Sequence, residues 1–289
     1  MTPFVVVLIL ISAAMHAGWN LLARRQREET IFFARMLAVV ALVGLLPATI
    51  SEIMTRSLPP TAWLCVAGSG VCLGLYFWFL ARAYGSSEFT VVYPVARALP
   101  ILFIALCDVV RGHMPSPLGW VGVVLVTAGC FLAPLHSLRD FTVGKYFNRA
   151  SLWMLLAAAG SVGVTLLDKI ASEVVQPGPA TAARYGYVLY ATACVVYLIS
   201  MRGTKTREKI ATNWITPAFC ACLTFGGYWL ILWAFQMVPR ASYVFAFRQF
   251  SIVIAVVLAF MLYRERGLVV RIAGALLITA GCVLIGGWG

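Results

Sequence analysis

The sequence GVVLVTAGC, which spans Gly122–Cys130, recurs in closely similar form as GALLITAGC at Gly274–Cys282. Each copy lies in the last apolar stretch of one half of the chain. Three further residues recur upstream in the same order and at nearly the same offset: Gly74 with Gly226, Tyr76 with Tyr228 and Arg97 with Arg248. Recurrence at several sites in one order predicts that the two halves are repeats of a single fold.

The amino-acid composition predicts a protein embedded in a lipid bilayer. Of the 289 residues, 62% are hydrophobic and only 11% are charged, and the mean hydropathy is +0.92, unlike a soluble domain. A bilayer core of about 30 Å needs about 20 apolar residues per helix, so the chain has room for about ten spans. The formal net charge of +12 would suit nucleic acid, but Lys and Arg lie mostly in loops between apolar runs. We therefore expect no nucleic-acid partner.

Ten apolar runs bounded by charged or turn-forming residues predict ten transmembrane helices. We expect them near residues 3–22, 31–50, 62–83, 89–110, 118–136, 150–168, 179–200, 214–237, 242–263 and 268–287. The polar linker 138–149 then separates a first five-helix repeat (1–137) from a second (150–289). Because five is odd, the second repeat must enter the bilayer from the opposite side, which predicts an all-α membrane protein of two inverted repeats.

The distribution of basic residues predicts the orientation of these helices. Lys and Arg collect in cytoplasmic loops, and here they cluster after the first, fifth, seventh and ninth predicted spans. The clusters contain Arg24, Arg25, Arg27, Arg139, Lys145, Arg149, Arg202, Lys205, Arg207, Lys209, Arg264, Arg266 and Arg271. We therefore expect a multi-pass protein of the bacterial inner membrane, with both termini in the periplasm and the loop Met201–Asn213 in the cytoplasm.

No motif for nucleotide-driven or enzymatic chemistry is present. The chain has no GxxxxGK[ST] loop for phosphate, no HExxH pair and no GxSxG nucleophile turn. Its eight Cys lie in apolar segments without metal-binding spacing, and its ten acidic residues form no paired cluster. We therefore expect no metal, no cofactor and no enzyme activity, and the simplest hypothesis is a carrier driven by a solute or ion gradient.

Two arginines at equivalent repeat positions are candidates for a substrate site. Arg97 and Arg248 fall within predicted spans, where inserting an Arg costs on the order of 3 kcal/mol or more, so each should face a cavity or a partner. Pro94 and Pro100 flank Arg97 and predict a kinked or interrupted helix there. The alternative is that backbone carbonyls or Asp108 hold the guanidinium groups for packing alone.

Polar and aromatic residues on other spans could complete such a site. His16, Trp19 and Asn20 lie near one face of the first predicted helix, where His16 could relay protons or be a structural histidine. Trp19 could equally anchor that helix at the membrane interface. Tyr76 and Tyr228 occupy equivalent positions, where their rings could pack on a substrate or on neighbouring helices.

The sixth predicted span, the counterpart of the first, ends at the charged pair Asp168 and Lys169. Asp168 is a candidate for ion coupling because the pair could meet charges at the edge of a cavity. The pair could also be a hydrated helix end, and its position at the end of an apolar run favours this second interpretation.

Two long stretches resemble the EamA-type repeat of the drug/metabolite transporter superfamily. They are YPVARALPILFIAL followed by PSPLGWVGVVLVTAGC (within Tyr93–Cys130), and SYVFAFRQFSIVIAVVLAFMLYRERGLVVRIAGALLITAGC (Ser242–Cys282). The opening HAGWNLLARR (His16–Arg25) is similar to a subset of the same group. The resemblance covers nearly the whole chain, and it implies a ten-helix carrier that works by alternating access and exports amino acids or other small metabolites.

The sequence departs from that family pattern in ways that bear on the substrate. Small multidrug members carry a Glu in the first helix to bind cations, whereas here that helix has no acidic residue. Where relatives often carry Glu after the repeated Arg, this chain has Gln249. We therefore expect an anionic or zwitterionic metabolite rather than a cationic drug. The expected substrate-binding residues are Arg97, Arg248, Tyr76, Tyr228, Trp19 and Asn20, with His16 and Asp168 as candidate coupling residues.

Two other functions remain open at this point. The same fold could flip a lipid-linked sugar, or the chain could be a membrane accessory subunit with no transport of its own. The expected partners are a small-molecule solute and membrane lipid, while substrate identity, direction, coupling ion and oligomeric state stay open.

Overall fold

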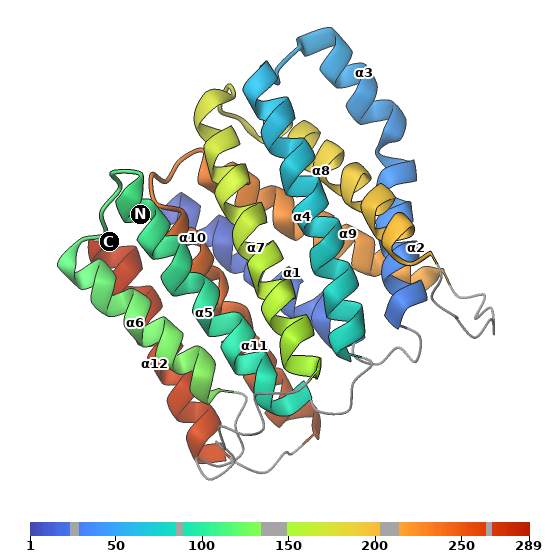
Figure 1. Cartoon of the computed structure of the whole chain (residues 1–289). Coiled ribbons are helices and arrows are strands. Elements are labelled where there is room, and N and C mark those ends of the chain that lie inside the picture. Colours follow the sequence, from blue (N-terminus) through green and yellow to red (C-terminus); the bar gives the residue numbers. More distant parts are fainter. Residues whose placement is uncertain (24–28, 85–88, 134–148, 203–213, 264–267) are drawn as a thin grey trace.

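The computed structural model describes residues 1–23, 29–84, 89–133, 149–202, 214–263 and 268–289, and within these ranges it is helical and has no strand. The helices are α1 (Pro3–Ala23), α2 (Glu29–Val43), α3 (Leu45–Thr55), α4 (Pro60–Tyr84), α5 (Phe89–Val110), α6 (Pro117–Leu132), α7 (Arg149–Val174), α8 (Pro179–Ser200), α9 (Ile215–Phe235), α10 (Ala241–Arg248), α11 (Phe250–Tyr263) and α12 (Leu268–Trp288). Figure 1 shows one bundle of long helices with both chain termini close together. The prediction of an all-α fold is confirmed.

Most of these helices are suited to a bilayer. In the described residues, seven helical segments are long and apolar enough to cross a membrane, and the bent pair α2–α3 makes an eighth. The helix α5 and the shorter apolar helix α6 occupy the positions of the fourth and fifth predicted spans. The chain is therefore a multi-pass membrane protein whose helices follow the predicted order.

Two predicted spans are each divided into two helical segments, of which one pair is sharply bent. The span predicted at 31–50 divides at Gly44 into α2 and α3, which bend by 47°. The span predicted at 242–263 divides at Gln249 into α10 and α11. By contrast, α5 runs through both of its prolines as one helix, because a bundle tolerates the loss of single backbone donors. The interruption expected beside Arg97 lies instead beside the equivalent Arg248.

Local residues set several helix ends. The helix α6 begins at Pro117, and the preceding Ser116 hydroxyl accepts the N–H of Gly119 at 2.9 Å, an N-cap arrangement. The helix α3 ends at Arg56, whose φ of 46° is left-handed and whose N–H donates to the Glu52 carbonyl at 2.7 Å. These caps allow the chain to turn within a few residues and return into the bundle.

The repeated glycine motifs pack against each other where α6 meets α12, the last helices of the two halves. A Cβ added to Gly129 would lie 2.6 Å from the carbonyl oxygen of Gly274. A Cβ added to Gly281 would lie 2.6 Å from the carbonyl oxygen of Gly122. The first glycine of each motif thus meets the last glycine of the other, so these equivalent helices are antiparallel. Antiparallel equivalents are what two inverted five-helix repeats require.

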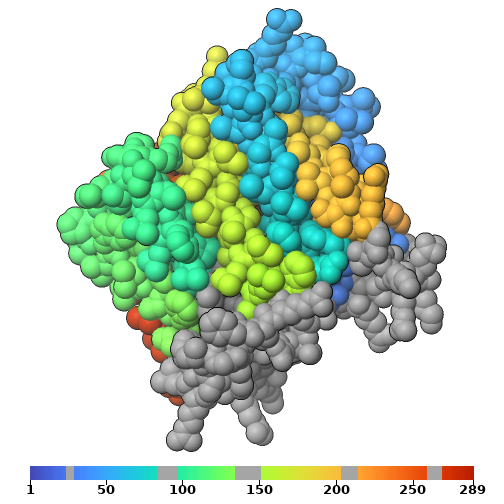
Figure 2. All heavy atoms as spheres, viewed as in Figure 1, coloured from blue at the N-terminus to red at the C-terminus, as the bar shows by residue number. Residues whose placement is uncertain are grey.

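Other helices of each repeat pack mainly against helices of the other repeat. The helix α4 packs on α7 and α8, and its equivalent α9 packs on α1 and α2. Figure 2 shows the side chains of α4 and α7 meeting along one face of the molecule. The equivalent helices α2 and α8 are also antiparallel, since Tyr197 donates to the Thr30 carbonyl and Tyr187 to the Ala41 carbonyl. This packing places residues of both repeats around a shared centre.

Both chain termini lie at one end of the bundle, which we call the termini end. The Met1 amino group donates to the Gly286 carbonyl at 3.2 Å, and the Ser116 hydroxyl donates to the Trp288 carbonyl at 2.9 Å. The segments 24–28, 85–88, 134–148, 203–213 and 264–267 lie outside the described residues. Most of the predicted basic clusters, the linker 138–149 and the loop Met201–Asn213 fall wholly or largely in those segments.

Candidate functional site

A cavity of about 80 Å³, lined by apolar and polar side chains, lies between the two repeats. Its walls come from α1, α4 and α5 of the first repeat and from α7, α8, α9 and α10 of the second. Its polar and aromatic lining includes His16, Trp19, Asn20, Tyr76, Arg97, Ser161, Thr165, Tyr190, Thr224, Tyr228, Arg248 and Gln249. The six residues expected to bind substrate all line this cavity, as does His16, whereas Asp168 lies outside its wall.

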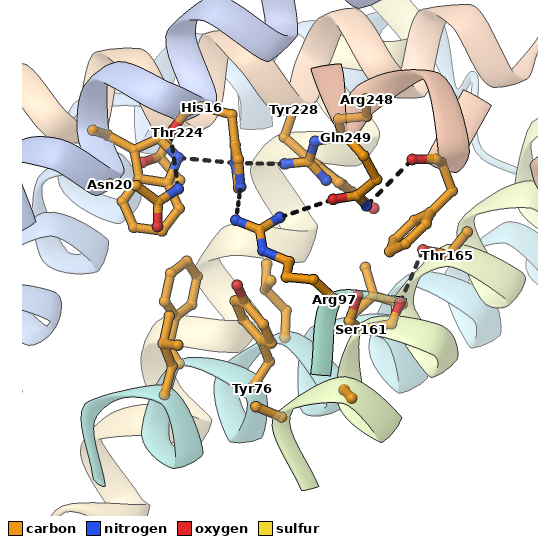
Figure 3. Close-up of a pocket in the computed structure, with 18 of the residues that line it drawn as sticks. His16, Asn20, Tyr76, Arg97, Ser161, Thr165, Thr224, Tyr228, Arg248 and Gln249 are labelled. Atoms are coloured by element: carbon orange, nitrogen blue, oxygen red, sulfur yellow. Dashed lines mark hydrogen bonds between the residues drawn. The ribbon is translucent and has the colours of Figure 1, made fainter. Parts of the chain in front are cut away.

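His16 brings the two arginines together. Nη2 of Arg97 lies 3.0 Å from Nε2 of His16, and Nη2 of Arg248 lies 3.1 Å from Nδ1. Trp19, nearly one turn further along α1, also directs its indole N–H at Nδ1, at 3.2 Å. Figure 3 shows the guanidinium groups reaching the imidazole from different helices. Residues of both repeats therefore meet at a single ring.

The donors around His16 outnumber its acceptors. A neutral imidazole has one acceptor nitrogen and one N–H, yet donors of Arg97, Arg248 and Trp19 converge on it. At least one of these groups must face the ring N–H or share the single lone pair. Within the described residues, Nε of Arg248 is also buried without a hydrogen-bond partner. The cavity thus directs more donors at His16 than its ring can accept.

Each guanidinium has a second neighbour in the cavity. The guanidinium carbon of Arg248 lies 5.3 Å from the ring centre of Tyr228, a cation–π contact. Nη1 of Arg97 lies 3.4 Å from Oε1 of Gln249, whose Nε2 in turn donates to the Phe245 carbonyl at 3.4 Å. The tyrosine ring and the amide are uncharged, so these contacts orient the arginines without neutralising them.

The side chains of α1 and α4 form another wall of the cavity. Trp19 is 2% exposed and packs edge-on against His16, so it is not an interfacial anchor. Asn20 donates its amide to the His16 carbonyl at 2.8 Å. Tyr76 points from α4 with its hydroxyl toward Arg97 in Figure 3. Aromatic rings therefore surround the arginine pair together with a few polar groups.

Asp108 positions α10 and does not hold the arginines. Its carboxylate oxygens accept the backbone N–H groups of Ala241 at 3.2 Å and Ser242 at 2.8 Å. An acidic side chain at this place satisfies free donors of the first helical turn and suits the helix dipole. The alternative that Asp108 locks Arg97 or Arg248 is therefore wrong, because the carboxylate caps the helix at whose far end Arg248 lies.

The charged pair on α7 lies inside the helix rather than at its end. The helix α7 continues to Val174, and Asp168 and Lys169 are only 1% and 3% exposed. Tyr185 donates to one oxygen of Asp168 at 2.8 Å, and Tyr228 donates to the other. The interpretation of a hydrated helix end is wrong, because neighbouring helices cover charges that interrupt the apolar run.

Several polar lining residues were not expected from the sequence, namely Ser161, Thr165, Tyr190 and Thr224, while Gln249 had been noted only as a departure from the family pattern. Ser161 and Thr165 stand four positions apart on α7, and the Thr165 hydroxyl donates to the Ser161 carbonyl at 2.9 Å. Such spacing puts two side chains on one helix face. This four-residue spacing of Ser161 and Thr165 is the sequence signal that could have predicted a polar face on α7.

The sequence profile of the EamA-like transporter family matches residues 3–134 and again residues 148–287. The chain belongs to the EamA-like transporter family. The double match agrees with two repeats and with the drug/metabolite transporter superfamily. A comparison with curated proteins found no match. One solved structure, described only as "Crystal structure of protein", is 14% identical with a TM-score of 0.68 over 99% of this chain and 98% of that chain, so it shares the fold.

Membership of the EamA-like family points to a transporter rather than an enzyme. Within the described residues, no three His, Cys, Asp or Glu side chains gather as metal ligands would. Arginine, histidine and tyrosine side chains supply the hydrogen-bonding groups of the cavity in this EamA-like transporter.

Proposed function

We propose that this EamA-like transporter is a secondary active carrier that exports a small, carboxylate-bearing metabolite, such as an amino acid, by alternating access. The observation that carries the proposal is the convergence of Arg97 and Arg248 on His16 in a cavity lined by both repeats. Buried charge within a membrane protein is costly and usually marks a substrate or ion pathway.

A carboxylate suits the two arginines of the cavity. Two guanidinium groups on one imidazole repel each other, and burial away from water strengthens this repulsion. A carboxylate placed between them can accept from both, because the planar guanidinium fork matches two carboxylate oxygens. Nε of Arg248 is a further donor for such a ligand. Tyr76 and Tyr228 would then border the apolar part of the solute.

The cavity must widen to accept a metabolite. Its volume of about 80 Å³ is below the roughly 300–1,000 Å³ of typical ligand pockets, so we take the structure as a contracted state. Toward the termini end, Arg111, the residue after α5, pairs with Glu173 of α7. Lys169 of α7 donates to the Phe235 carbonyl of α9 at 2.9 Å. Opening toward that end would break the pair Arg111–Glu173, which joins the two repeats, whereas the contact of Lys169 with Phe235 lies within the second repeat.

The proposed location is a bacterial inner membrane, with the termini end in the periplasm. The basic clusters favour this orientation, and the direction of export rests on the resemblance to exporters of the superfamily. The proposed moving bodies are the five-helix units 1–137 and 150–289, joined by the linker 138–149. Their relative motion would expose the cavity to each side in turn.

Purified protein in sealed vesicles tests this proposal. Vesicles loaded in turn with radiolabelled amino acids and other small carboxylates should release at least one of them faster than protein-free vesicles do. The double variant Arg97→Gln, Arg248→Gln should lose this release. The matched control Arg202→Gln, at an exposed position after α8, should keep it.

The outcomes separate the functions that the sequence left open. If vesicles with folded wild-type protein release no carboxylate, the proposal is rejected. Transfer of a lipid-linked sugar between the two leaflets by the same vesicles would favour a flippase. Absence of both activities would favour an accessory subunit.

A further inference from the structure

A buried carboxylate on α7 lies beside the cavity but outside its wall. Asp168 is 1% exposed and does not line the cavity. Its oxygens accept hydrogen bonds from the hydroxyl groups of Tyr185 on α8, at 2.8 Å, and Tyr228 on α9. From α4 it is faced by Cys65, Ser69 and Cys72. Three neighbouring helices thus surround one carboxylate with neutral groups.

Asp168 has no ion-pair partner in the described part of the chain. The ion pairs there are Arg111–Glu173, His113–Glu173, Lys169–Glu173 and Arg184–Glu52. The adjacent Lys169 turns away, since its Nζ donates to the Phe235 carbonyl at 2.9 Å and lies 3.3 Å from Glu173. Keeping a carboxylate ionised among neutral groups away from water is costly. Carboxylates in such places often take up and release protons.

Tyr228 connects Asp168 to the arginine pair. Its hydroxyl donates to Asp168, while its ring lies 5.3 Å from the guanidinium carbon of Arg248. A change in the charge of Asp168 therefore acts on the ring against which Arg248 rests. By linkage, a ligand that changes the position or charge environment of Arg248 acts equally on Asp168.

The repeats place His16 and Asp168 at equivalent positions. The residue offset that relates Tyr76 to Tyr228 also relates His16 on α1 to Asp168 on α7. In the first repeat this position holds the imidazole that both arginines contact. In the second repeat it holds the carboxylate that is bonded to a tyrosine of the cavity wall. Equivalent positions of the two repeats thus hold a histidine that contacts two cations and a carboxylate that contacts neutral hydroxyl groups.

We propose that Asp168 is a proton-binding site that couples a proton gradient to solute movement at the arginine pair, an inference that rests on the proposed function. As a carboxylate, Asp168 accepts from both tyrosines. After it gains one proton, the carboxyl carries an O–H donor and accepts less strongly, which frees the Tyr228 hydroxyl to turn toward the cavity. The proton enters from one side of the membrane and leaves to the other, and no bond to the solute forms or breaks.

Infrared difference spectroscopy of the protein in lipid nanodiscs tests the proton site without any solute. A change from acidic to alkaline pH should remove the high-frequency C=O band of a protonated carboxyl shielded from water. The variant Asp168→Asn should lack this band, whereas Asp108→Asn should keep it, because backbone N–H groups hold Asp108 as a helix cap. A band that persists in Asp168→Asn, or wild-type protein without such a band, overturns the proposal.

Transport of a radiolabelled amino-acid mixture in sealed vesicles tests the coupling. With an imposed pH gradient, Asp168→Asn should lose accumulation on the order of tenfold but still exchange labelled for unlabelled solute, because Asp168 lies outside the cavity wall. Asp168→Glu keeps a carboxyl and should restore part of the accumulation, which separates lost coupling from misfolding. Tyr185→Phe keeps the hydrogen bond between Tyr228 and Asp168, so this variant should also retain accumulation of the solute.

The two proposals can fail separately. Accumulation by Asp168→Asn equal to that of the wild type would overturn the coupling and leave the proposed function intact. A wild type that moves no carboxylate, although Asp168 titrates in the infrared experiment, would reject the proposed function and leave the proton site standing.

Discussion

Arg97 and Arg248 belong to different repeats, yet their guanidinium groups contact the two ring nitrogens of one imidazole. The shared imidazole therefore holds two positively charged groups, one from each half of the chain, close to each other. Like charges repel, and their repulsion grows as water is excluded. An anion that enters between them gains attraction to both, so the pair favours a negatively charged ligand.

Replacing either arginine by lysine should weaken transport more than folding. Arg97→Lys and Arg248→Lys keep the positive charge, but an ammonium cannot present two parallel N–H donors in a fixed plane. Loss of one charge-assisted hydrogen bond, worth about 1.5–3 kcal/mol, predicts an apparent affinity lower by about tenfold or more. Transport rate against solute concentration and thermal unfolding, measured on the same purified variants, check this prediction.

A purely structural role for the arginines predicts the reverse pattern. Arg97→Ala or Arg248→Ala would then lower the unfolding temperature, while surviving protein would bind solute with near-normal affinity. Normal affinity in well-folded lysine variants at both positions would remove these residues from the substrate site.

Adding a methyl group where α6 meets α12 should destabilise the protein. Gly129→Ala places a Cβ 2.6 Å from the Gly274 carbonyl oxygen, so the helices must move apart. Overpacking of this kind typically costs about 1–3 kcal/mol, and the unfolding temperature in detergent should fall. The control is Gly287→Ala on α12, where an added Cβ meets nothing within 4 Å. Equal unfolding temperatures for the two variants would contradict the close contact of the repeats.

Removing the Asp108 carboxylate should loosen the start of α10. Asp108→Ala leaves the buried N–H groups of Ala241 and Ser242 without their acceptor, which predicts a stability loss of about 1–3 kcal/mol. Asp108→Asn keeps one amide oxygen and should lose less. In thermal unfolding, the double variant with Arg97→Ala should show the sum of the two single-variant effects, since Asp108 does not contact Arg97. A large coupling energy would revive the direct interaction of Asp108 with Arg97.

Cysteine labelling should place both termini on one side of the membrane. Met1 and Gly286 are joined by a hydrogen bond, so cysteines introduced at Thr2 and Gly289 in a variant without native Cys should react with an impermeant maleimide from the same side. The basic clusters predict that this side is periplasmic and that Arg202→Cys reacts only from the cytoplasm. Cytoplasmic labelling at Gly289 would invert the proposed orientation, whereas labelling of the termini from opposite sides would contradict the fold.

Helix order and repetition could be predicted because a bilayer offers the backbone no hydrogen-bond partners. Each crossing must therefore be a run of about 20 apolar residues that bonds internally, and such runs are visible in the sequence. The recurrence of Gly122–Cys130 as Gly274–Cys282 then indicates two repeats, and an odd helix count makes them inverted. The equivalence of Arg97 and Arg248 follows from the same recurrence.

Bends and buried charges could not be predicted in the same way. Hydropathy alone does not mark the break at Gly44, although Pro47 nearby favours a bend, and it does not mark the division at Gln249. Asp168 and Lys169 look like the end of a span, although helices of both repeats cover them in the structure. Hydropathy records how apolar a segment is, whereas bending and burial depend on which other segments pack against it.

The sequence by itself determined the membrane class and the inverted repeats, because these follow from apolar run length and motif recurrence along one chain, and its resemblance to the EamA-type repeat indicated the family. Only the tertiary structure decided that Arg97 and Arg248 share His16, that Asp108 caps α10 and that Tyr228 links Asp168 to the cavity. Each of these contacts joins helices far apart in sequence, and its formation depends on helix rotations and close approaches that no local pattern of residues encodes.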